Sequence, residues 1–482
     1  MKRAGFWVVG AAIALAIVLR PATPIDETRY LTVAWEMWSR GDALVPHLNG
    51  EPYSHKPPLL FWLMHAGWSL VGPSEIWARL VPGLAALAVL AGSRRLAARL
   101  WADEATAAAV PAALAGSLAF LVVATFTGFD MLLAACVSIA WNGLVDATDP
   151  ARRGRGWTTF AAGLGLGILT KGPVALLLVL PAALAAPWWA AGSPAVARGR
   201  RGRWYAALAL AVVAGAALAL AWAIPAAIRG GPQFRDAIFV RQTAGRVVES
   251  FAHRRPFWWY VPIAPLLLLP LALAPAVRRG WARALARPLE RGARFALAAT
   301  LPAFVGFSLV SGKQPQYLLP LLPAAAMLAA RAARLGSPAE RAPARALGAF
   351  AVVSLVLFAA LHVVFAWKYA AAYDLEPFSR RIGELQAAGR PVGFLGAYHG
   401  QFGFLGRLSR PLLVQPSAGA EAFFRRHPDG VLVAEIRRGD GSAAGRREIL
   451  AQPYRGGRLV AWEATGAVTT PSTAPDPNAR PR

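Results

Sequence analysis

Acidic and basic residues gather between residues 26 and 58 of this apolar chain, in the stretch DETRYLTVAWEMWSRGDALVPHLNGEPYSHKPP. Asp26 and Glu27 are adjacent carboxylates, and Arg29 follows one helical turn after Asp26. Lys56 lies near the end of the stretch. A carboxylate can take a proton from a hydroxyl as a general base, and arginine and lysine are the usual partners of phosphate. These residue types are those of a phosphate site with a base beside it.

Each of these residues also has an ordinary structural interpretation. Asp26 can cap a helix that begins here, and Glu27 can interact favourably with the helix dipole. Arg29 and Lys56 can extend to lipid headgroups, as cations at a membrane interface often do. The two histidines of the stretch, His55 among them, are a weak signal for a metal. The stretch alone leaves both interpretations open.

Further charged residues lie in turns between apolar segments. Asp130 lies in FTGFDMLLA, where it could also cap a helix, and an ionisable residue at membrane depth is a functional candidate by default. Lys171 in LTKGPV and Lys313 in SGKQPQY occupy Gly/Pro turns, and Arg241 lies in the loop 229–257. Together with the first stretch, these residues predict a site for a lipid-linked phosphate with a general base nearby.

Three familiar catalytic or nucleotide-binding patterns are absent from the sequence. GLGLGILTKG resembles a phosphate-binding loop, but Gly172 follows Lys171 where the Walker pattern requires Ser or Thr. There is no Asp-x-Asp pair of the kind that holds a metal–nucleotide complex, and no Gly-x-Ser-x-Gly nucleophile elbow. The sequence therefore does not predict a nucleotide-bound donor.

The composition is that of a membrane protein. The chain has 482 residues, of which 56% are hydrophobic and 16% are charged, and its mean hydropathy is +0.42. Apolar runs of near-spanning length recur along it, which predicts a polytopic membrane protein. A net charge of +26 would suggest nucleic acid as the partner of a soluble protein, but here we attribute it to arginine-rich loops. The single cysteine, Cys136, excludes an internal disulfide.

We predict about eleven or more membrane-spanning helices. The predicted spans cover residues 5–22, 77–93, 105–124, 131–147, 158–170, 173–191, 204–228, 258–276, 294–311, 315–332 and 346–367. The loops between them alternate between arginine-rich and arginine-poor, and the positive-inside rule makes the arginine-rich side cytoplasmic. The external side then holds the loop 23–76, the turns of Asp130, Lys171 and Lys313, and everything after about residue 368.

Two surface helices are expected in the first external loop. Apolar residues at helical spacing predict a helix that lies in the membrane surface. The stripe consists of Tyr30, Val33, Ala34, Met37 and Trp38. The apolar segment 59–72 is too short to span comfortably, and we expect it at the interface as well. The charged groups between the two helices are then held at the outer surface, with Lys56 just before the second helix.

The chain after the last span has a different character. EPFSRRIGELQAAG predicts a helix, and PVGFLGAY, PLLVQ, GVLVAEI and RLVAWEA predict short strands. Residues 466–482 are rich in Pro, Thr and Ala, which predicts disorder. We therefore expect a transmembrane domain over 1–369, a small external α/β domain over 370–465, and a disordered tail.

Five segments occur in an order that is typical of one family. They are PIDETRYLTVAWEMWSRGDALVPHLNGEPYSHKPP, FTGFD, LTKGP, FVRQTAGRVVESFAHRRPFWWYVP and SGKQPQYLLPLLPA. In them the chain resembles bacterial integral-membrane glycosyltransferases similar to the aminoarabinose transferase of lipid A, which are related to protein O-mannosyltransferases. The resemblance covers about residues 20–335 closely and the C-terminal domain more loosely. It implies an all-α C-type glycosyltransferase fold and a sugar donor carried by polyprenyl phosphate.

The resemblance also implies roles for individual residues. Asp26 would be the catalytic carboxylate and Asp130 a second acidic residue of the site. Arg29, Tyr53, Lys56 and Tyr317 would contact the carrier phosphate or its surroundings. From their positions, the further candidates for substrate binding are Glu27, Lys171, Arg241 and Lys313. The family usually has an acidic residue before the lysine, where this chain has Ser54 and His55, so we assign no metal site and keep His55 as a possible ligand. No cofactor is expected, and a need for a divalent cation stays open.

These observations predict an inverting glycosyltransferase of the bacterial inner membrane, with its site and C-terminal domain in the periplasm. The outer face lacks nucleotide sugars, which agrees with a donor attached to a lipid. Lysine and arginine can neutralise the leaving phosphate, and a carboxylate can accept the proton of the acceptor. The expected partners are a polyprenyl-phosphate-linked sugar, a lipid or protein acceptor, and membrane lipids; nucleic acid is not among them.

Two alternatives stay open. A transporter or flippase of lipid-linked sugars would use the same cations without a reaction, although many transporters have internal repeats and none is visible here. Within the enzyme class, the acceptor could be lipid A, another envelope glycolipid or a protein hydroxyl.

Overall fold

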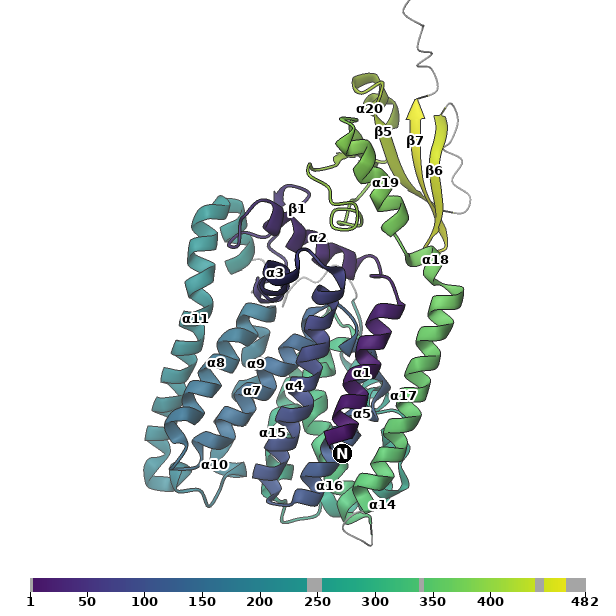
Figure 1. The fold of residues 1–482 in the computed structure, drawn as a ribbon. Coiled ribbons are helices and arrows are strands. Elements are labelled where there is room, and N and C mark those ends of the chain that lie inside the picture. Colours follow the sequence, from purple (N-terminus) through teal and green to yellow (C-terminus); the bar gives the residue numbers. More distant parts are fainter. Residues whose placement is uncertain (1–2, 241–253, 338–341, 438–445, 465–482) are drawn as a thin grey trace, which may run out of the picture.

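Long helices run side by side through most of the protein, and a small domain with a mixed sheet lies at one end of them (Figure 1). This computed structural model describes residues 3–240, 254–337, 342–437 and 446–464. The tail that we predicted to be disordered, 466–482, lies outside the described residues. We call the long helices the helical body.

Helices lie in each of the eleven predicted spans, but several spans are broken into two shorter helices, and the helix Pro275–Ala284 lies mostly beyond the predicted span 258–276. The predicted number of membrane-spanning helices therefore stays a prediction. The body contains α1 (Arg3–Leu19), α4 (Glu75–Trp101), α5 (Glu104–Ala115), α6 (Leu118–Ala124), α7 (Phe129–Ala147), α8 (Arg153–Lys171), α9 (Val174–Leu184), α10 (Ala186–Trp189), α11 (Arg201–Asp236), α13 (Tyr260–Leu267), α14 (Pro275–Ala284), α15 (Arg291–Leu309), α16 (Leu322–Leu335) and α17 (Ala342–Lys368). Among the described residues, 6 helices are long and apolar enough to cross a membrane. The protein is therefore a multi-pass membrane protein.

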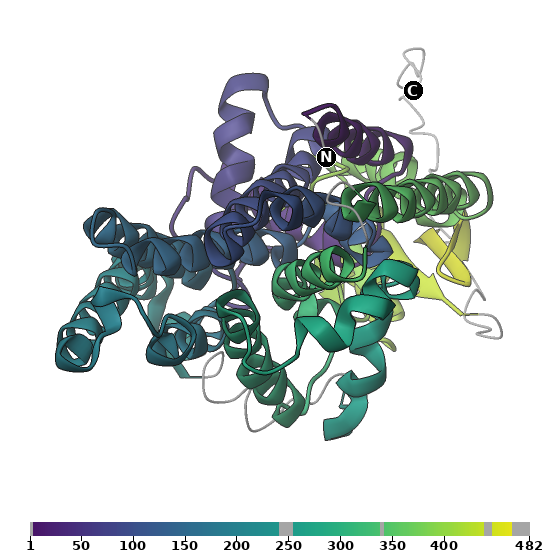
Figure 2. The ribbon, with the colours of Figure 1, turned by 90° about the horizontal axis from the view of Figure 1, so that it is seen from below.

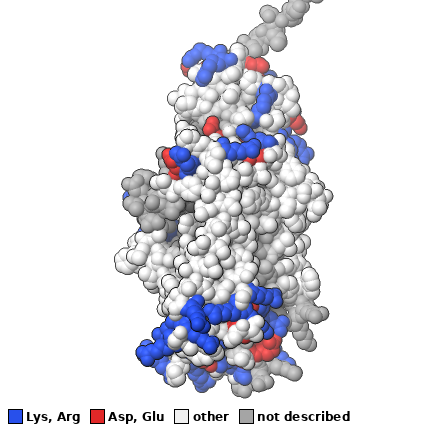
Figure 3. Space-filling view, turned by 90° about the vertical axis from the view of Figure 1, so that its left-hand side faces the viewer, with Lys and Arg blue, Asp and Glu red and all other residues white. Residues whose placement is uncertain are grey.

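Charge is distributed as this assignment requires. On the face shown in Figure 3, a belt that is almost free of charged side chains separates a basic end from a second charged band. The arginine-rich loops meet at the end opposite the sheet: Arg99 pairs with Asp146 at 2.5 Å, and Arg331 with Asp103 at 2.7 Å. These loops therefore lie together, as the alternation of arginine predicted.

Seen along the helices, α1 and α17 lie next to each other at one edge of the body, and α11 lies at the opposite edge (Figure 2). The two helices at the first edge matter below, because a cavity opens beside the end of α1.

The first loop folds over the end of the body that carries the sheet (Figure 1). It contains α2 (Asp26–Ser39), a short hairpin of β1 (His47–Leu48) and β2 (Glu51–Pro52), and α3 (Leu59–Val71). Both predicted surface helices are thus present. The N-cap of α2 is Ile25, and no side chain caps the helix, so the capping role expected for Asp26 was wrong: Asp26 is already the first helical residue.

The apolar stripe of α2 is covered by protein rather than by lipid. Tyr30, Val33, Ala34 and Met37 are buried, and the ring of Trp38 lies 5.9 Å from that of Trp68 in α3. Because α2 is amphipathic, the stripe packs on the body and leaves the opposite face for another partner. That partner is the C-terminal domain.

The C-terminal domain has a mixed sheet with helices beside it. Its elements are α18 (Ala370–Tyr373), α19 (Glu376–Ala387), β3 (Val392–Leu395), β4 (Leu413–Gln415), α20 (Ala420–Arg426), β5 (Val431–Ile436), β6 (Arg446–Tyr454) and β7 (Gly457–Ala464). The strand order is β4-β3-β5-β7-β6, with β3 parallel to β4 and β5, and with β7 antiparallel to β5 and β6. The helix and four strands that the sequence predicted are confirmed, and β6 was missed. Its charged residues lie on an exposed edge strand, where apolar alternation is weak.

Residues 396–412, which we call the docking loop, fasten this domain to α2. Thr32 donates its hydroxyl to the Gly400 carbonyl at 2.7 Å, and Trp35 donates its indole N–H to the Leu408 carbonyl at 2.9 Å. Gly400 has φ +81°, and a Cβ there would lie 2.7 Å from Leu48, so the close approach requires glycine.

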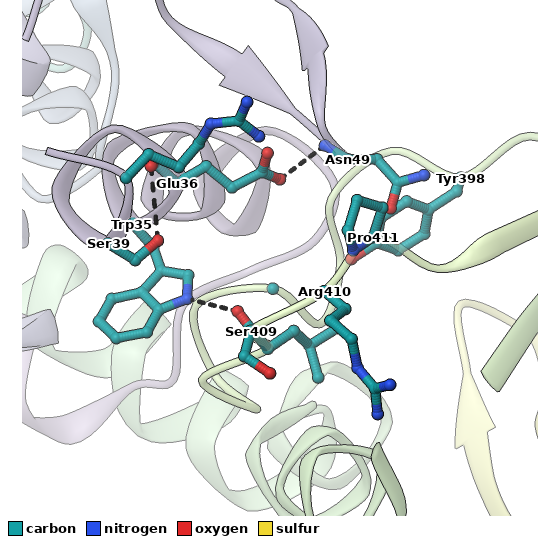
Figure 4. Close-up of a pocket in the computed structure, with 11 residues that line it drawn as sticks. Trp35, Glu36, Ser39, Asn49, Tyr398, Ser409, Arg410 and Pro411 are labelled. Atoms are coloured by element: carbon teal, nitrogen blue, oxygen red, sulfur yellow. Dashed lines mark hydrogen bonds between the residues drawn. The ribbon is translucent and has the colours of Figure 1, made fainter. Parts of the chain in front are cut away.

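Figure 4 shows how the first loop and the docking loop meet around a small cavity. Glu36 accepts from the backbone N–H of Asn49 at 2.6 Å, and Asn49 exchanges two hydrogen bonds with the backbone of Leu412, at 3.0 and 2.8 Å. The C-terminal domain is thus held directly against the loop that carries the candidate site residues.

Candidate functional site

An aromatic cluster of Tyr30, Phe61 and Phe129 joins α2, α3 and α7, and candidate residues lie on α2, on α7 and in the loop before α3. The ring of Phe129, at the start of α7, lies 5.0 Å from that of Tyr30 in α2 and 5.7 Å from that of Phe61 in α3. Lys56 places its ammonium 5.5 Å from the centre of the Phe129 ring. Because edge-to-face ring contacts favour one geometry, the cluster fixes Lys56 relative to the starts of α2 and α7.

The Tyr30 hydroxyl lies within electrostatic reach of four candidate residues. Burial raises the pKa of Tyr30 well above its usual value, and the charges of Asp26, Tyr53 and Asp130 raise it further, whereas Arg29 lowers it. The charges of two carboxylates from different helices therefore act on one buried phenol. The sequence grouped these residues by side of the membrane, and the structure brings them to one place.

Asp26 is an accessible carboxylate of this group. Its Oδ1 lies 3.5 Å from an Arg29 guanidinium nitrogen, and 45% of its side chain is exposed. A loose, half-exposed pair of this kind leaves carboxylate oxygens open to solvent or to a substrate. Asp26 therefore has the access that a general base requires.

Asp130 has a different environment. It forms an ion pair with Lys171, at the end of α8, and both side chains are largely buried. The Lys171 ammonium also lies 4.3 Å from the centre of the ring of Tyr317, a residue of the 3-10 turn η6 (Pro315–Leu321). Three segments that are far apart in the sequence thus meet at the Lys171 ammonium. The pairing suits Asp130 for positioning rather than for proton transfer.

Glu27 points into the protein, where it is held on all sides. Arg20 binds its two carboxylate oxygens at 2.5 and 2.9 Å, and the backbone N–H of Thr127 donates to it at 2.7 Å. Thr23 adds bonds from its backbone N–H and its hydroxyl. Burial by itself would raise the pKa of Glu27, but the Arg20 charge and these bonds lower it to about 2. These contacts favour a structural role, and contact with substrate stays a prediction for Glu27.

Lys313 is engaged by the backbone of its own turn. Its ammonium donates to the carbonyl of Val310 and to that of Arg255, the latter at 3.1 Å. Because the side chain is buried, burial lowers its pKa. The contacts hold the turn before η6 in place, and thereby Tyr317.

The remaining candidates are placed less completely. The Tyr53 and His55 rings lie 5.0 Å apart, in the loop before α3. Within the described part of the chain, no three His, Cys, Asp or Glu residues gather as metal ligands would. Arg241 lies outside the described residues.

Sequence reasoning missed a residue of the C-terminal domain that lies beside the site. Burial lowers the pKa of His399 in the docking loop, the charge of Arg29 lowers it further, and that of Asp26 raises it. His399 precedes Gly400, which packs on the backbone of Arg29. No local pattern could have indicated this, because the two segments are about 370 residues apart.

Comparison with known proteins found similar sequences and structures. Residues 55–224 match the family model described as dolichyl-phosphate-mannose-protein mannosyltransferase. The chain is similar to this family over that segment. Two curated relatives are named undecaprenyl phosphate-alpha-4-amino-4-deoxy-L-arabinose arabinosyl transferase. That of Serratia proteamaculans is 29% identical over 343 residues, which are 68% of this chain and 59% of the relative. That of Pseudomonas aeruginosa is 32% identical over 317 residues, which are 63% of this chain and 54% of the relative. The chain thus spans less than two thirds of the length of these relatives.

Solved structures extend the likeness to the whole fold. The crystal structure of ArnT from Cupriavidus metallidurans bound to undecaprenyl phosphate matches with a TM-score of 0.77 and 19% identity, over 96% of this chain and 98% of that one. The apo form of the same protein matches with a TM-score of 0.76 and 20% identity, over 96% and 99%. The fold relationship that the sequence predicted is therefore confirmed.

Proposed function

We propose that the protein transfers a sugar from a polyprenyl-phosphate carrier to an acceptor hydroxyl, at the periplasmic face of the bacterial inner membrane. The observation that carries the proposal is the convergence at the aromatic cluster. Half-exposed Asp26, the cations Arg29 and Lys56, and the Asp130–Lys171 pair are brought together there from three helices and the loop before α3. Similarity to named transferases supports the same conclusion, since the relatives' names describe transfer from undecaprenyl phosphate.

The reaction assigned to this site is a single displacement. The acceptor oxygen attacks the anomeric carbon opposite the phosphate, and the bond between that carbon and the phosphate oxygen breaks with its electron pair on the oxygen. The acceptor proton passes to the Asp26 carboxylate. Transfer therefore inverts the anomeric configuration and releases polyprenyl phosphate. The additional negative charge on the released phosphate is stabilised by the Lys56 ammonium and the Arg29 guanidinium.

The other residues support this step. The Asp130–Lys171 pair and Tyr317 fix the start of α7, and with it Phe129 below Lys56. Tyr53, together with Lys56, lines the part of the site that binds the polyprenyl-phosphate carrier. In this scheme Glu27 and Lys313 hold backbone in place, and Arg241 adds a cation for the carrier.

The acceptor assigned here is lipid A or another envelope glycolipid. Mass spectrometry of envelope glycolipids from a deletion strain should show the loss of one sugar-bearing species, which the wild-type gene restores. Unchanged glycolipids together with a missing sugar on an envelope protein would assign a protein acceptor instead.

Lys56→Ala should weaken donor binding without disturbing the fold, because Lys56 lies in a loop rather than in a packed helix. A charged hydrogen bond to phosphate is worth roughly 1.5–3 kcal/mol, so affinity should fall about tenfold or more. Arg29→Ala should act similarly. Binding of undecaprenyl phosphate to purified protein measures both. The matched control is Lys368→Ala, at the end of α17, and equal affinity in all variants would assign these cations to lipid headgroups.

A cysteine at Glu421 should report the orientation. Glu421 is exposed on α20, and Cys136 is buried and can be replaced by serine. We expect Glu421→Cys to react with a membrane-impermeant thiol reagent in intact spheroplasts, because the arginine-rich loops lie at the opposite end of the body. Labelling that requires lysis would place the C-terminal domain in the cytoplasm.

A further inference from the structure

A second cavity, of about 470 Å³, lies beside the Arg20–Glu27 pair. It is formed by the end of α1, the start of α4, the junction of α18 and α19, and the docking loop. It therefore lies where the helical body meets the C-terminal domain (Figure 1). The charged residues that line it are Arg20, Glu75, Arg79, Asp374, Glu376 and Arg407.

One of these residues lacks partners that a buried cation needs. Arg79 is 2% exposed, and its Nη1 donates to the Arg20 carbonyl at 2.6 Å and to Glu75 at 2.9 Å. Within the described residues, its Nε and Nη2 have no hydrogen-bond partner. These two nitrogens form the edge of the guanidinium that binds two oxygens of one phosphate or carboxylate. A buried donor without an acceptor is costly, which indicates that an oxygen-bearing group belongs here.

The opposite side of the cavity provides a second cation and two acids. Arg407 donates to the Pro73 carbonyl at 2.9 Å, and its guanidinium stacks 3.9 Å from the centre of the Phe404 ring. Burial lowers the pKa of Arg407, and the charges of Glu75 and Glu376 raise it, so these acids are within electrostatic reach. Asp374 and Glu376 lie at the exposed rim.

The balance of charge restricts the ligand. Three arginines face three acids across the cavity, and Arg20 is already neutralised by Glu27. Glu75 is paired with Arg79 and Glu376 with Arg380, whereas Asp374 has no ion pair within the described residues. A purely anionic ligand would place its charge beside the Asp374 carboxylate. A ligand that carries both a phosphate and an amine matches both sets of groups.

The cavity is continuous with an apolar surface. Its walls include Val18, Leu19 and Ile76, whose side chains are 62%, 49% and 49% exposed. Exposed apolar residues on membrane-spanning helices face acyl chains. A ligand with acyl chains would thus extend from the charged cavity along the end of α1.

We propose that this cavity binds the headgroup of a zwitterionic phospholipid with a primary amine, of the phosphatidylethanolamine type, from the outer leaflet. Its phosphate binds Arg79 and Arg407, its ammonium binds Asp374 and Glu376, and its chains lie against α1. The lipid thereby links the body to the docking loop. This site is separate from the Asp26 site, and the proposal holds whether or not the protein transfers a sugar.

The test is thermal unfolding of purified protein in detergent, titrated with phosphatidylethanolamine, phosphatidylglycerol or inorganic phosphate. We expect half-maximal stabilisation at an about tenfold lower concentration of phosphatidylethanolamine than of phosphatidylglycerol. Inorganic phosphate should act weakly, because it lacks acyl chains. The proposal would be overturned if the two lipids stabilised the protein at equal concentrations. It would also be overturned if inorganic phosphate stabilised the protein at the same concentrations as phosphatidylethanolamine.

Variants at the rim separate the two halves of the headgroup, and they leave buried Arg79 in place. Asp374→Asn combined with Glu376→Gln should abolish the preference for phosphatidylethanolamine. Arg407→Gln should weaken the binding of both lipids about tenfold. The matched control is Glu421→Gln, an exposed acid of α20 that should change neither titration. A double variant that retains the wild-type preference would contradict the assignment of the ammonium.

Discussion

Replacing Glu27 with glutamine is expected to destabilise the protein strongly. Glu27 is fully buried, and its charge is the counter-ion of Arg20, which is itself buried. Removing one partner of a buried pair leaves the other charge uncompensated, at a cost of roughly 3–5 kcal/mol. Thermal unfolding in detergent should show this as a large fall in the midpoint. The matched control is Glu384→Gln, which breaks an exposed pair with Arg381 and should have little effect.

Acidification should act through the same carboxylate. Folding lowers the pKa of Glu27 from 4.5 to about 2, so the stabilisation is present above 4.5 and is lost as the pH falls towards 2. The shift corresponds to roughly 3 kcal/mol. Wild-type protein should lose this stabilisation over that range, and Glu27→Gln should lack that part of the pH dependence. Parallel curves of unfolding midpoint against pH for the two proteins would show that the Arg20–Glu27 pair contributes little to stability.

Asp26→Asn is expected to abolish transfer while leaving the fold and donor binding intact. Asp26 is half-exposed, its ion pair with Arg29 is loose, and no capping bond depends on it. Asparagine cannot accept a proton at neutral pH, so the rate should fall on the order of 10²-fold or more. Single-turnover transfer with bound donor measures this loss separately from affinity.

Two controls distinguish the base from its neighbours. Glu51→Gln removes an exposed carboxylate from the same loop and should transfer at the wild-type rate. Asp130→Asn removes the partner of Lys171 and should cause a smaller loss than Asp26→Asn, because it disturbs position rather than proton transfer. Transfer by Asp26→Asn at close to the wild-type rate would place the base elsewhere.

Much of the architecture could be predicted because it depends on local patterns. The period of apolar residues predicted α2. The alternation of arginine-rich and arginine-poor loops predicted which loops lie at the same end of the helical body. Lys171 and Asp130 were assigned to one site for the same reason, since both lie in turns on the arginine-poor side. The number and boundaries of the spans were harder to predict. A break such as the one between α5 and α6 interrupts the helix without changing the apolar composition of the run.

The remaining features depend on contacts between distant segments. Glu27 is adjacent to Asp26 and also carries a carboxylate, but one helical step of about 100° turns it towards Arg20 and away from the site. The apolar stripe of α2 was assigned to the membrane surface because a pattern does not reveal whether lipid or protein covers it. The docking of Gly400 on α2 depends on the C-terminal domain as a whole, so no pattern in the first loop could indicate it.

Transfer by purified protein tests the central claim most directly. The protein in detergent would be given polyprenyl-phosphate sugars and envelope lipids extracted from the producing strain. We predict equal amounts of free polyprenyl phosphate and a new glycolipid with an inverted anomeric centre, and neither product from Asp26→Asn. Intact donor after prolonged incubation, together with movement of the donor across the bilayer of reconstituted vesicles, would contradict the account and identify a flippase.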